Sequence, residues 1–185
     1  MKNRSYIAPD ASDRARRVEL ILFDVDGVLT DGQILIIPDA QGTVHEFKMF
    51  NTQDGVGLSF ARRIGLRLGV LTGRTSEAVA ARAKELGMEI VEQGSWNKLE
   101  TYQKIRAQVN LEDAQIAYMG DDLQDLPVMR RAGLAIGPGN AQEDIRQYCH
   151  LITRRTGGHG AVREALEFII RAHGKWDEIM ARYLA

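Results

Sequence analysis

Two aspartates, Asp24 and Asp26, directly follow an apolar run in the segment ELILFDVDGVLTDG at positions 19–32. In an extended chain alternate side chains point to the same side, so both carboxylates can face one spot. Carboxylates this close repel each other, and burial makes the repulsion worse. The pattern therefore predicts either a solvated turn or a site for a cation, and Gly27 permits the sharp turn that follows.

A second acidic group lies in AYMGDDLQDLPVM at positions 117–129, where Asp121, Asp122 and Asp125 follow another apolar run. One interpretation is that Asp121 and Asp122 cap a helix, which is a common role for aspartate. Clustered carboxylates also bind hard cations, and Mg²⁺ takes one or two carboxylates together with substrate phosphate. Because two strand ends of this kind occur in one chain, we favour a Mg²⁺ site.

Groups that can bind an anion occur between the two acidic groups. Thr72 and Gly73, in VLTGRTSEAV, lie at a strand end just before a helix, where a hydroxyl and backbone N–H groups can hold an anion. Lys98 opens a helix, where its charge opposes the helix dipole unless a fixed anion accompanies it. Each feature alone fits an ordinary loop or a surface lysine. Together they predict a phosphoryl site in which one carboxylate attacks phosphorus and a second transfers protons.

Alternating strands and helices must position these residues. We expect strands at 18–24, 67–72, 88–93, 114–120, 133–137 and 148–153, and helices at 53–65, 75–87, 97–108, 122–132 and 160–184. Thr75 or Ser76 is the expected N-cap of the second helix. This alternation is typical of an α/β fold with a Rossmann-like, doubly wound parallel sheet, whose sites lie beyond the carboxyl ends of the strands. Two apolar-leaning runs around PDAQG, at about 32–49, predict a β-hairpin that projects from the body.

Composition limits the class of protein. A chain of 185 residues predicts a single domain over 1–185. A net charge of −1 gives no reason to expect nucleic acid or an anionic membrane as a partner. The single cysteine, Cys149, excludes an internal disulfide and favours a cytoplasmic protein. The first residues lack the apolar core of a signal peptide, and we expect no membrane span.

The segments DVDGVLTDG and LTGR, residue Lys98 and the segment GDDLQD resemble, in this order, the four motifs of the haloacid dehalogenase superfamily of phosphatases. The resemblance implies that Asp24 is the nucleophile and Asp26 the general acid/base. It implies a Mg²⁺ cofactor held by Asp24, the main-chain carbonyl of Asp26, and Asp121, with Asp125 supporting the metal directly or through water. Thr72, Gly73 and Lys98 would bind the phosphoryl group.

Only the hairpin separates the first motif from the rest, so the chain resembles members without a large cap domain. EFKMFNTQDGVGL, GSWNKL and GGHGAVREALEFIIRAHGK resemble the members that act on a phosphorylated eight-carbon keto-sugar acid of lipopolysaccharide synthesis. The resemblance implies a homotetramer in which the hairpin drives assembly and the glycine-rich tail, about 156–185, can reach an adjoining site. The implied substrate contacts are Asp26, Asn51, Thr52, Gln53, Asp54, Gly55, Arg74, Arg82 and Lys98. Arg74 and Arg82 are about two helical turns apart, which suits one helix face.

Several alternatives stay open at this point. Gln53 and His159 stand where many members carry arginine, which weakens the case for one particular sugar acid. Phosphatases of nine-carbon acids share the scaffold, although QDGVG and GGHGAVRE favour the eight-carbon group. A phosphoacceptor signalling domain would have similar residues in another order. An inactive scaffold is a further alternative, against which the presence of both Asp24 and Asp26 argues.

Overall fold

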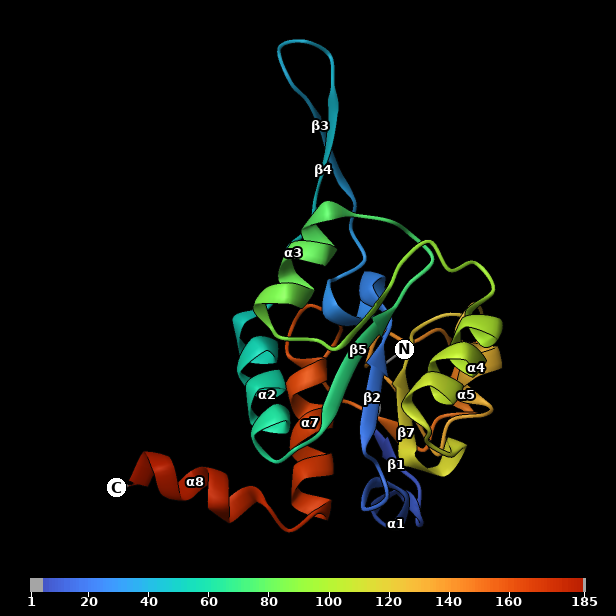
Figure 1. Cartoon of the computed structure of the whole chain (residues 1–185), viewed down its shortest axis with the longest axis vertical. Coiled ribbons are helices and arrows are strands. Elements are labelled where there is room, and N and C mark those ends of the chain that lie inside the picture. The colour runs from blue at the N-terminus through green and yellow to red at the C-terminus, as the bar shows by residue number, and fades with distance from the viewer. Residues whose placement is uncertain (1–4, 185) are drawn as a thin grey trace.

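The computed structural model describes residues 5–184, which form an α/β domain around a seven-stranded sheet (Figure 1). In spatial order the strands are β1 (Tyr6–Ile7), β9 (Leu151–Ile152), β8 (Leu134–Gly137), β7 (Ile116–Met119), β2 (Leu20–Phe23), β5 (Arg67–Leu71) and β6 (Ile90–Glu92). Every neighbouring pair is parallel except β1 with β9. This confirms the expected α/β fold with a largely parallel sheet, and β5, β2 and β7 end side by side.

Helices cover both faces of the sheet, as a doubly wound fold requires. The elements α1 (Ala11–Ala15), α2 (Thr52–Arg63), α3 (Glu77–Glu85), α7 (Ala161–Ala172) and α8 (Trp176–Leu184) contribute to one apolar cluster, and α4 (Lys98–Val109), α5 (Leu126–Met129) and α6 (Glu143–Arg146) to the other. Strand β2 supplies both clusters, because Ile21 and Phe23 face one side while Leu20 and Leu22 face the other.

Local structure departs from the sequence-based expectation at several elements. The helix expected at 122–132 is a single turn, α5, which begins only at Leu126, because the backbone N–H groups of Asp121 and Asp122 donate to the Asp125 side chain and residues 121–125 form a hydrogen-bonded turn instead. Ser76 is at the N-cap position of α3, but its side chain makes no capping hydrogen bond. The helix expected at 160–184 is divided into α7 and α8 at Gly174, which has φ +68°. The short elements β1, α1 and α6 were not expected.

A two-stranded antiparallel hairpin projects from the body beyond α3 (Figure 1). It consists of β3 (Leu35–Pro38) and β4 (Val44–Phe47), with Leu35 opposite Phe47 and Ile36 opposite Glu46. The structure thus contains a hairpin where the segment 32–49 predicts one, and the described residues include no large cap. Within residues 5–184, no helix is long and apolar enough to cross a membrane.

Candidate active site

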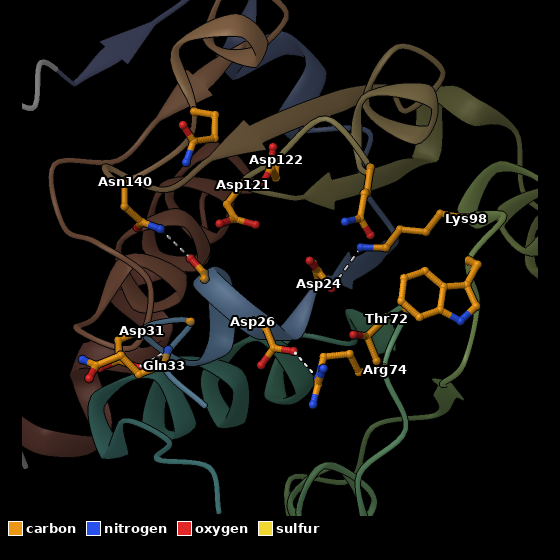
Figure 2. Close-up of a pocket in the computed structure, with 16 residues that line it drawn as sticks. Asp24, Asp26, Asp31, Gln33, Thr72, Arg74, Lys98, Asp121, Asp122 and Asn140 are labelled. Atoms are coloured by element: carbon orange, nitrogen blue, oxygen red, sulfur yellow. Dashed lines mark hydrogen bonds and ion pairs between the residues drawn. The ribbon is translucent and has the colours of Figure 1, made fainter. Parts of the chain in front are cut away.

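The predicted strand ends meet at one pocket of about 600 Å³ (Figure 2). Asp24 follows β2, Thr72 follows β5, and Asp121 lies two residues beyond β7, so the rule for parallel sheets holds in this chain. The wall of the pocket consists of Asp24, Asp26, Gly27, Asp31, Gly32, Gln33, Thr72, Gly73, Arg74, Trp96, Lys98, Asp121, Asp122, Gln124, Asn140 and Gln142.

Gly27 provides the sharp turn after the first pair of aspartates. Its φ of +84° is in the region that glycine adopts without strain. A side chain here would also place its Cβ 2.0 Å from Asp121 Oδ2, which is far inside van der Waals contact. The glycine therefore lets the loop after β7 approach the loop after β2, so that the two acidic groups share one pocket.

Lys98 supplies the positive charge at the floor of the pocket. It opens α4 behind the N-cap Asn97 and is 4% exposed, and its Nζ lies 3.0 Å from Asp24 Oδ1 and 2.6 Å from Asp125 Oδ1. Burial lowers the pKa of Lys98, but the charges of Asp125 and Asp24 outweigh burial and raise the pKa above its ordinary value. The anionic partner that a lysine at this helix position requires is thus found in the chain itself.

Asp125 is fully buried and accepts hydrogen bonds on both oxygens. Oδ1 accepts from Lys98 and, at 2.6 Å, from the Tyr118 hydroxyl, while Oδ2 accepts from the backbone N–H groups of Asp121 at 2.9 Å and Asp122 at 3.2 Å. Asp125 therefore ties the loop after β7 to Lys98. Sequence reasoning missed Tyr118, although it is a buried residue of β7, the strand that precedes Asp121 and Asp125.

Asp24 and Asp121 have the electrostatic character of an incomplete cation site. Burial and the nearby charge of Asp125 raise the pKa of Asp24 to about 6, although Lys98 opposes the shift. Burial, Asp125 and Asp24 raise the pKa of Asp121 to about 7. Oxygens of Asp24, Asp121 and Asp125 lie within 4.8 Å of one another. A hard divalent cation fits this oxygen donor set and would offset the repulsion that adds to the effect of burial on both pKa values.

Asp26 shares the pocket but its carboxylate has different partners. Oδ1 accepts from Lys48 Nζ at 2.5 Å, and Oδ2 lies 3.7 Å from Arg74 Nε. Sequence reasoning missed Lys48, because nothing in its own segment shows that it faces the first motif. It also missed Asn140, which donates to the Gly27 carbonyl at 2.9 Å and accepts from the Gly157 N–H at 2.7 Å. Asn140 follows β8, so the strand-end rule was a signal that could have identified it.

The other residues expected to meet substrate lie outside this pocket: Asn51, Thr52, Gln53, Asp54, Gly55 and Arg82. Asn51 caps α2 and donates to the Gly158 carbonyl at 3.1 Å. Asp54 is buried and accepts from the Arg163 N–H at 2.7 Å, at the start of α7. The glycine-rich segment at 157–160 accordingly packs on its own chain, with Gly158 N–H donating to the Val28 carbonyl at 3.2 Å.

The two arginines expected on one helix face are separated by the structure. Helix α3 begins at Glu77, so Arg74 lies in the loop before it, where it reaches the pocket. Arg82 is on the helix, pairs with Glu85 at 2.9 Å and lies 5.9 Å above the Phe50 ring. The expectation of a shared face was wrong, because the helical spacing does not extend back to Arg74.

The fold and the pocket define a haloacid dehalogenase-like hydrolase. Residues 69–166 match this family, and the chain belongs to it. The chain is 37% identical over 184 residues to 3-deoxy-D-manno-octulosonate 8-phosphate phosphatase from Yersinia pestis, and the matched region covers 96% of each protein. Among solved structures, a probable YrbI family phosphatase from Pseudomonas syringae superimposes with a TM-score of 0.90, at 41% identity over 96% of this chain and 99% of that one. The 3-deoxy-D-manno-octulosonate 8-phosphate phosphatase from Moraxella catarrhalis, in complex with magnesium ion, phosphate ion and KDO, has a TM-score of 0.88 at 40% identity, over 94% and 98%.

Proposed function

We propose that this chain is a Mg²⁺-dependent phosphatase that hydrolyses 3-deoxy-D-manno-octulosonate 8-phosphate to the free sugar acid and phosphate. The observation that carries the proposal is the pocket floor, where Lys98 Nζ joins the Asp24 carboxylate to Asp125 beside Thr72 and Asp121. The relatives named for this activity match nearly the whole chain and support the choice of substrate. The same reasoning proposes a place in lipopolysaccharide synthesis.

The residues divide the chemistry among them. Asp24 attacks phosphorus, the bond from phosphorus to the sugar oxygen breaks, and Asp26 gives a proton to the departing oxygen. Asp26 then takes a proton from the water that attacks phosphorus in the aspartyl-phosphate, which frees Asp24. Thr72, Gly73 and Lys98 hold the phosphoryl oxygens in place. Arg74, whose side chain is 43% exposed at the pocket, is the group we assign to the substrate carboxylate.

Residues of the chain can hold Mg²⁺ at the pocket floor. Asp24 and Asp121 would contribute side-chain oxygens, and Asp26 its main-chain carbonyl. Asp125 already accepts four hydrogen bonds, so we assign it the role of fixing the loop that carries Asp121. When bound, Mg²⁺ neutralises charge on the phosphoryl oxygens and lets a phosphate dianion approach the carboxylates.

A homotetramer is part of the proposal, with the hairpin as its contact. The hairpin residues Ile34, Leu35, Ile36, Ile37, Val44 and Phe47 are between 43% and 62% exposed in the single chain. Exposed apolar side chains gathered on one projecting element mark a protein–protein contact. Residues 51–55 and Arg82 lie outside the pocket of their own chain. In such an assembly, they would contact substrate only where a neighbouring copy completes the site.

The first test is phosphate release from the eight-carbon substrate by Asp24→Asn. We expect turnover to fall by a factor on the order of 10⁴ or more, because the nucleophile is lost, while thermal unfolding shows an intact fold. Asp13→Asn, at an exposed residue of α1, is the matched control and should keep full activity. Substantial activity in Asp24→Asn would contradict the nucleophile assignment.

The second test concerns metal and substrate. Chelation should abolish turnover and added Mg²⁺ should restore it; full activity in thoroughly chelated solution would contradict the metal site. A comparison of kcat/KM on the eight-carbon and nine-carbon keto-sugar acid phosphates tests the substrate. A higher value for the nine-carbon compound would assign the chain to the alternative substrate, with the chemistry unchanged.

A further inference from the structure

Lys48 is a buried lysine that touches the pocket only through other side chains. It follows β4 directly, and its side chain is 1% exposed. Nζ lies 2.5 Å from Asp26 Oδ1 and 3.2 Å from Glu46 Oε1. Lys48 does not form part of the pocket wall, whereas its partner Asp26 does. Any influence of Lys48 on the reaction must pass through Asp26 or Glu46.

Four alternating charges meet at this point, and we call Asp26, Glu46, Lys48 and Arg74 the hairpin-base cluster. Arg74 pairs with Glu46 and approaches Asp26 Oδ2 to 3.7 Å, which Figure 2 marks with a dashed line. Glu46 and Lys48 come from alternate positions of one extended segment, so both side chains leave the same side of it. The foot of the hairpin therefore brings a carboxylate, from Glu46, and an ammonium group, from Lys48, to the first motif.

Burial makes the contact of Lys48 with Asp26 a fixed one. A buried ammonium group is costly unless carboxylates pair with it, and Lys48 has two such partners. Asp26 in turn is held at Oδ1 by a residue that does not line the pocket. Its other oxygen lies toward Arg74, which does line the pocket.

We propose that Lys48 is a positioning residue, which holds the Asp26 carboxylate at the angle from which it transfers a proton to the departing sugar oxygen. The inference rests on the general acid/base role proposed for Asp26. Orientation matters here because a misplacement of about 1 Å can cost on the order of 10² in rate. The hairpin then has a second function besides assembly, since its base sets the geometry of Asp26.

The nature of the leaving group separates this role from a merely structural one. When a sugar phosphate reacts, the phosphorus–oxygen bond breaks and the alcohol oxygen takes its proton from Asp26. When p-nitrophenyl phosphate reacts, the same bond breaks but nitrophenolate leaves without a proton. The constant kcat/KM covers only the steps up to departure of the leaving group, so the later attack of water does not affect the comparison.

The experiment measures kcat/KM on both substrates for wild type, Lys48→Met and Lys48→Arg. We expect Lys48→Met to lose about 10²-fold on the sugar phosphate, within the range of general acid catalysis, and less than about 5-fold on p-nitrophenyl phosphate. Lys48→Arg, which keeps the charge, should recover part of the loss. Lys104→Met, at a lysine whose side chain is 70% exposed, is the matched control and should resemble wild type on both.

Two further measurements keep the proposal falsifiable. In an Asp26→Asn background, Lys48→Met should cause almost no additional loss on the sugar phosphate, because both changes remove the same function. An equal loss on the two substrates, or a full additional loss in the double variant, would overturn the positioning role and make Lys48 structural. If Asp26→Asn loses the same factor in kcat/KM on both substrates, the proposed acid/base role of Asp26 is wrong, and the inference about Lys48 falls with it. If only p-nitrophenyl phosphate is hydrolysed by wild type, the substrate assignment fails instead.

Discussion

Single residues organise the pocket floor through one buried carboxylate. Asp125 accepts from Lys98, from Tyr118 and from two backbone N–H groups, and it is inaccessible to solvent. Hydrogen bonds to a charged group are stronger than neutral ones, and a charge left unpaired by loss of its partner is costly. Much of the geometry of Asp121 and Lys98 therefore depends on a residue that is not itself exposed to substrate.

Removal of the Asp125 charge should destabilise the protein more than removal of one of its donors. Asp125→Asn is expected to lower the free energy of unfolding by about 3 kcal/mol, because Lys98 loses a buried counter-charge. Tyr118→Phe removes a single hydrogen bond to the same carboxylate and should cost about 2 kcal/mol or less. Urea unfolding of both variants checks the order. Equal losses would mean that Asp24 alone satisfies Lys98.

Residue types near strand ends were predictable from the sequence, whereas partners from distant segments were not. Asp24, Thr72 and Asp121 lie in one pocket because the parallel sheet brings its strand ends together, and Lys98 joins them from the start of α4. Lys48 reaches Asp26 across 22 positions of chain. Such a contact depends on how the hairpin base packs, and no periodicity in the segment EFKMF encodes it.

At the scale of elements, His150 joins β8 to the chain beside it. The Ala135 N–H donates to His150 Nδ1 at 2.9 Å, while the His150 N–H donates to the Ala135 carbonyl at 2.8 Å. Ala8 N–H donates to the His150 carbonyl at 2.8 Å, which connects the segment after β1. Nδ1 must be unprotonated to accept its bond. Burial and the charge of Arg14 lower the pKa of His150, against the opposing effect of Asp10.

The protein should therefore lose stability through His150 as the pH falls below about 6.5, the ordinary histidine pKa. In that range the unfolded chain takes up a proton that the folded chain, with its lower pKa, does not, so unfolding becomes more favourable. His150→Asn keeps an acceptor for Ala135 but does not titrate. Urea unfolding from pH 8 to pH 5 should show a smaller decline for the variant. Parallel declines would contradict the histidine contribution.

Elements with a strong pattern were predictable, and those set by tertiary contacts were not. The buried strands and α2, α3, α4 and α7 follow from apolar runs, capping residues and glycine stops. Residues 122–125 form a loop where the sequence predicts helix, because their conformation depends on the Asp125 carboxylate, which accepts from the backbone N–H groups of Asp121 and Asp122. The two-residue strand β1 carries too few residues for a periodic signal and depends on its pairing with β9, which lies within the strand expected at 148–153.

At the scale of the whole molecule, the hairpin is the feature whose exposed apolar side chains have no partner within the described part of the chain. Leu35, Ile37, His45 and Phe47 share one face of the ribbon, and Ile36, Pro38, Val44 and Glu46 share the other. An isolated two-stranded hairpin is marginally stable in water, and this one is apolar on both sides. Its extension from the body is therefore consistent with burial against further copies of the chain.

Introducing charge on the apolar face should disrupt the assembly that we propose. Leu35→Glu combined with Ile37→Glu should convert the tetramer into smaller species in sedimentation velocity runs, because burying the new carboxylates without partners is costly. Gln41→Glu adds one negative charge at the hairpin turn without removing apolar surface, and should leave the assembly unchanged. Hydrolysis of p-nitrophenyl phosphate by the dissociated variant then shows whether the pocket of one chain is sufficient for chemistry. A double variant that sediments like wild type would exclude this face from the contact, as would a wild-type protein that is already monomeric.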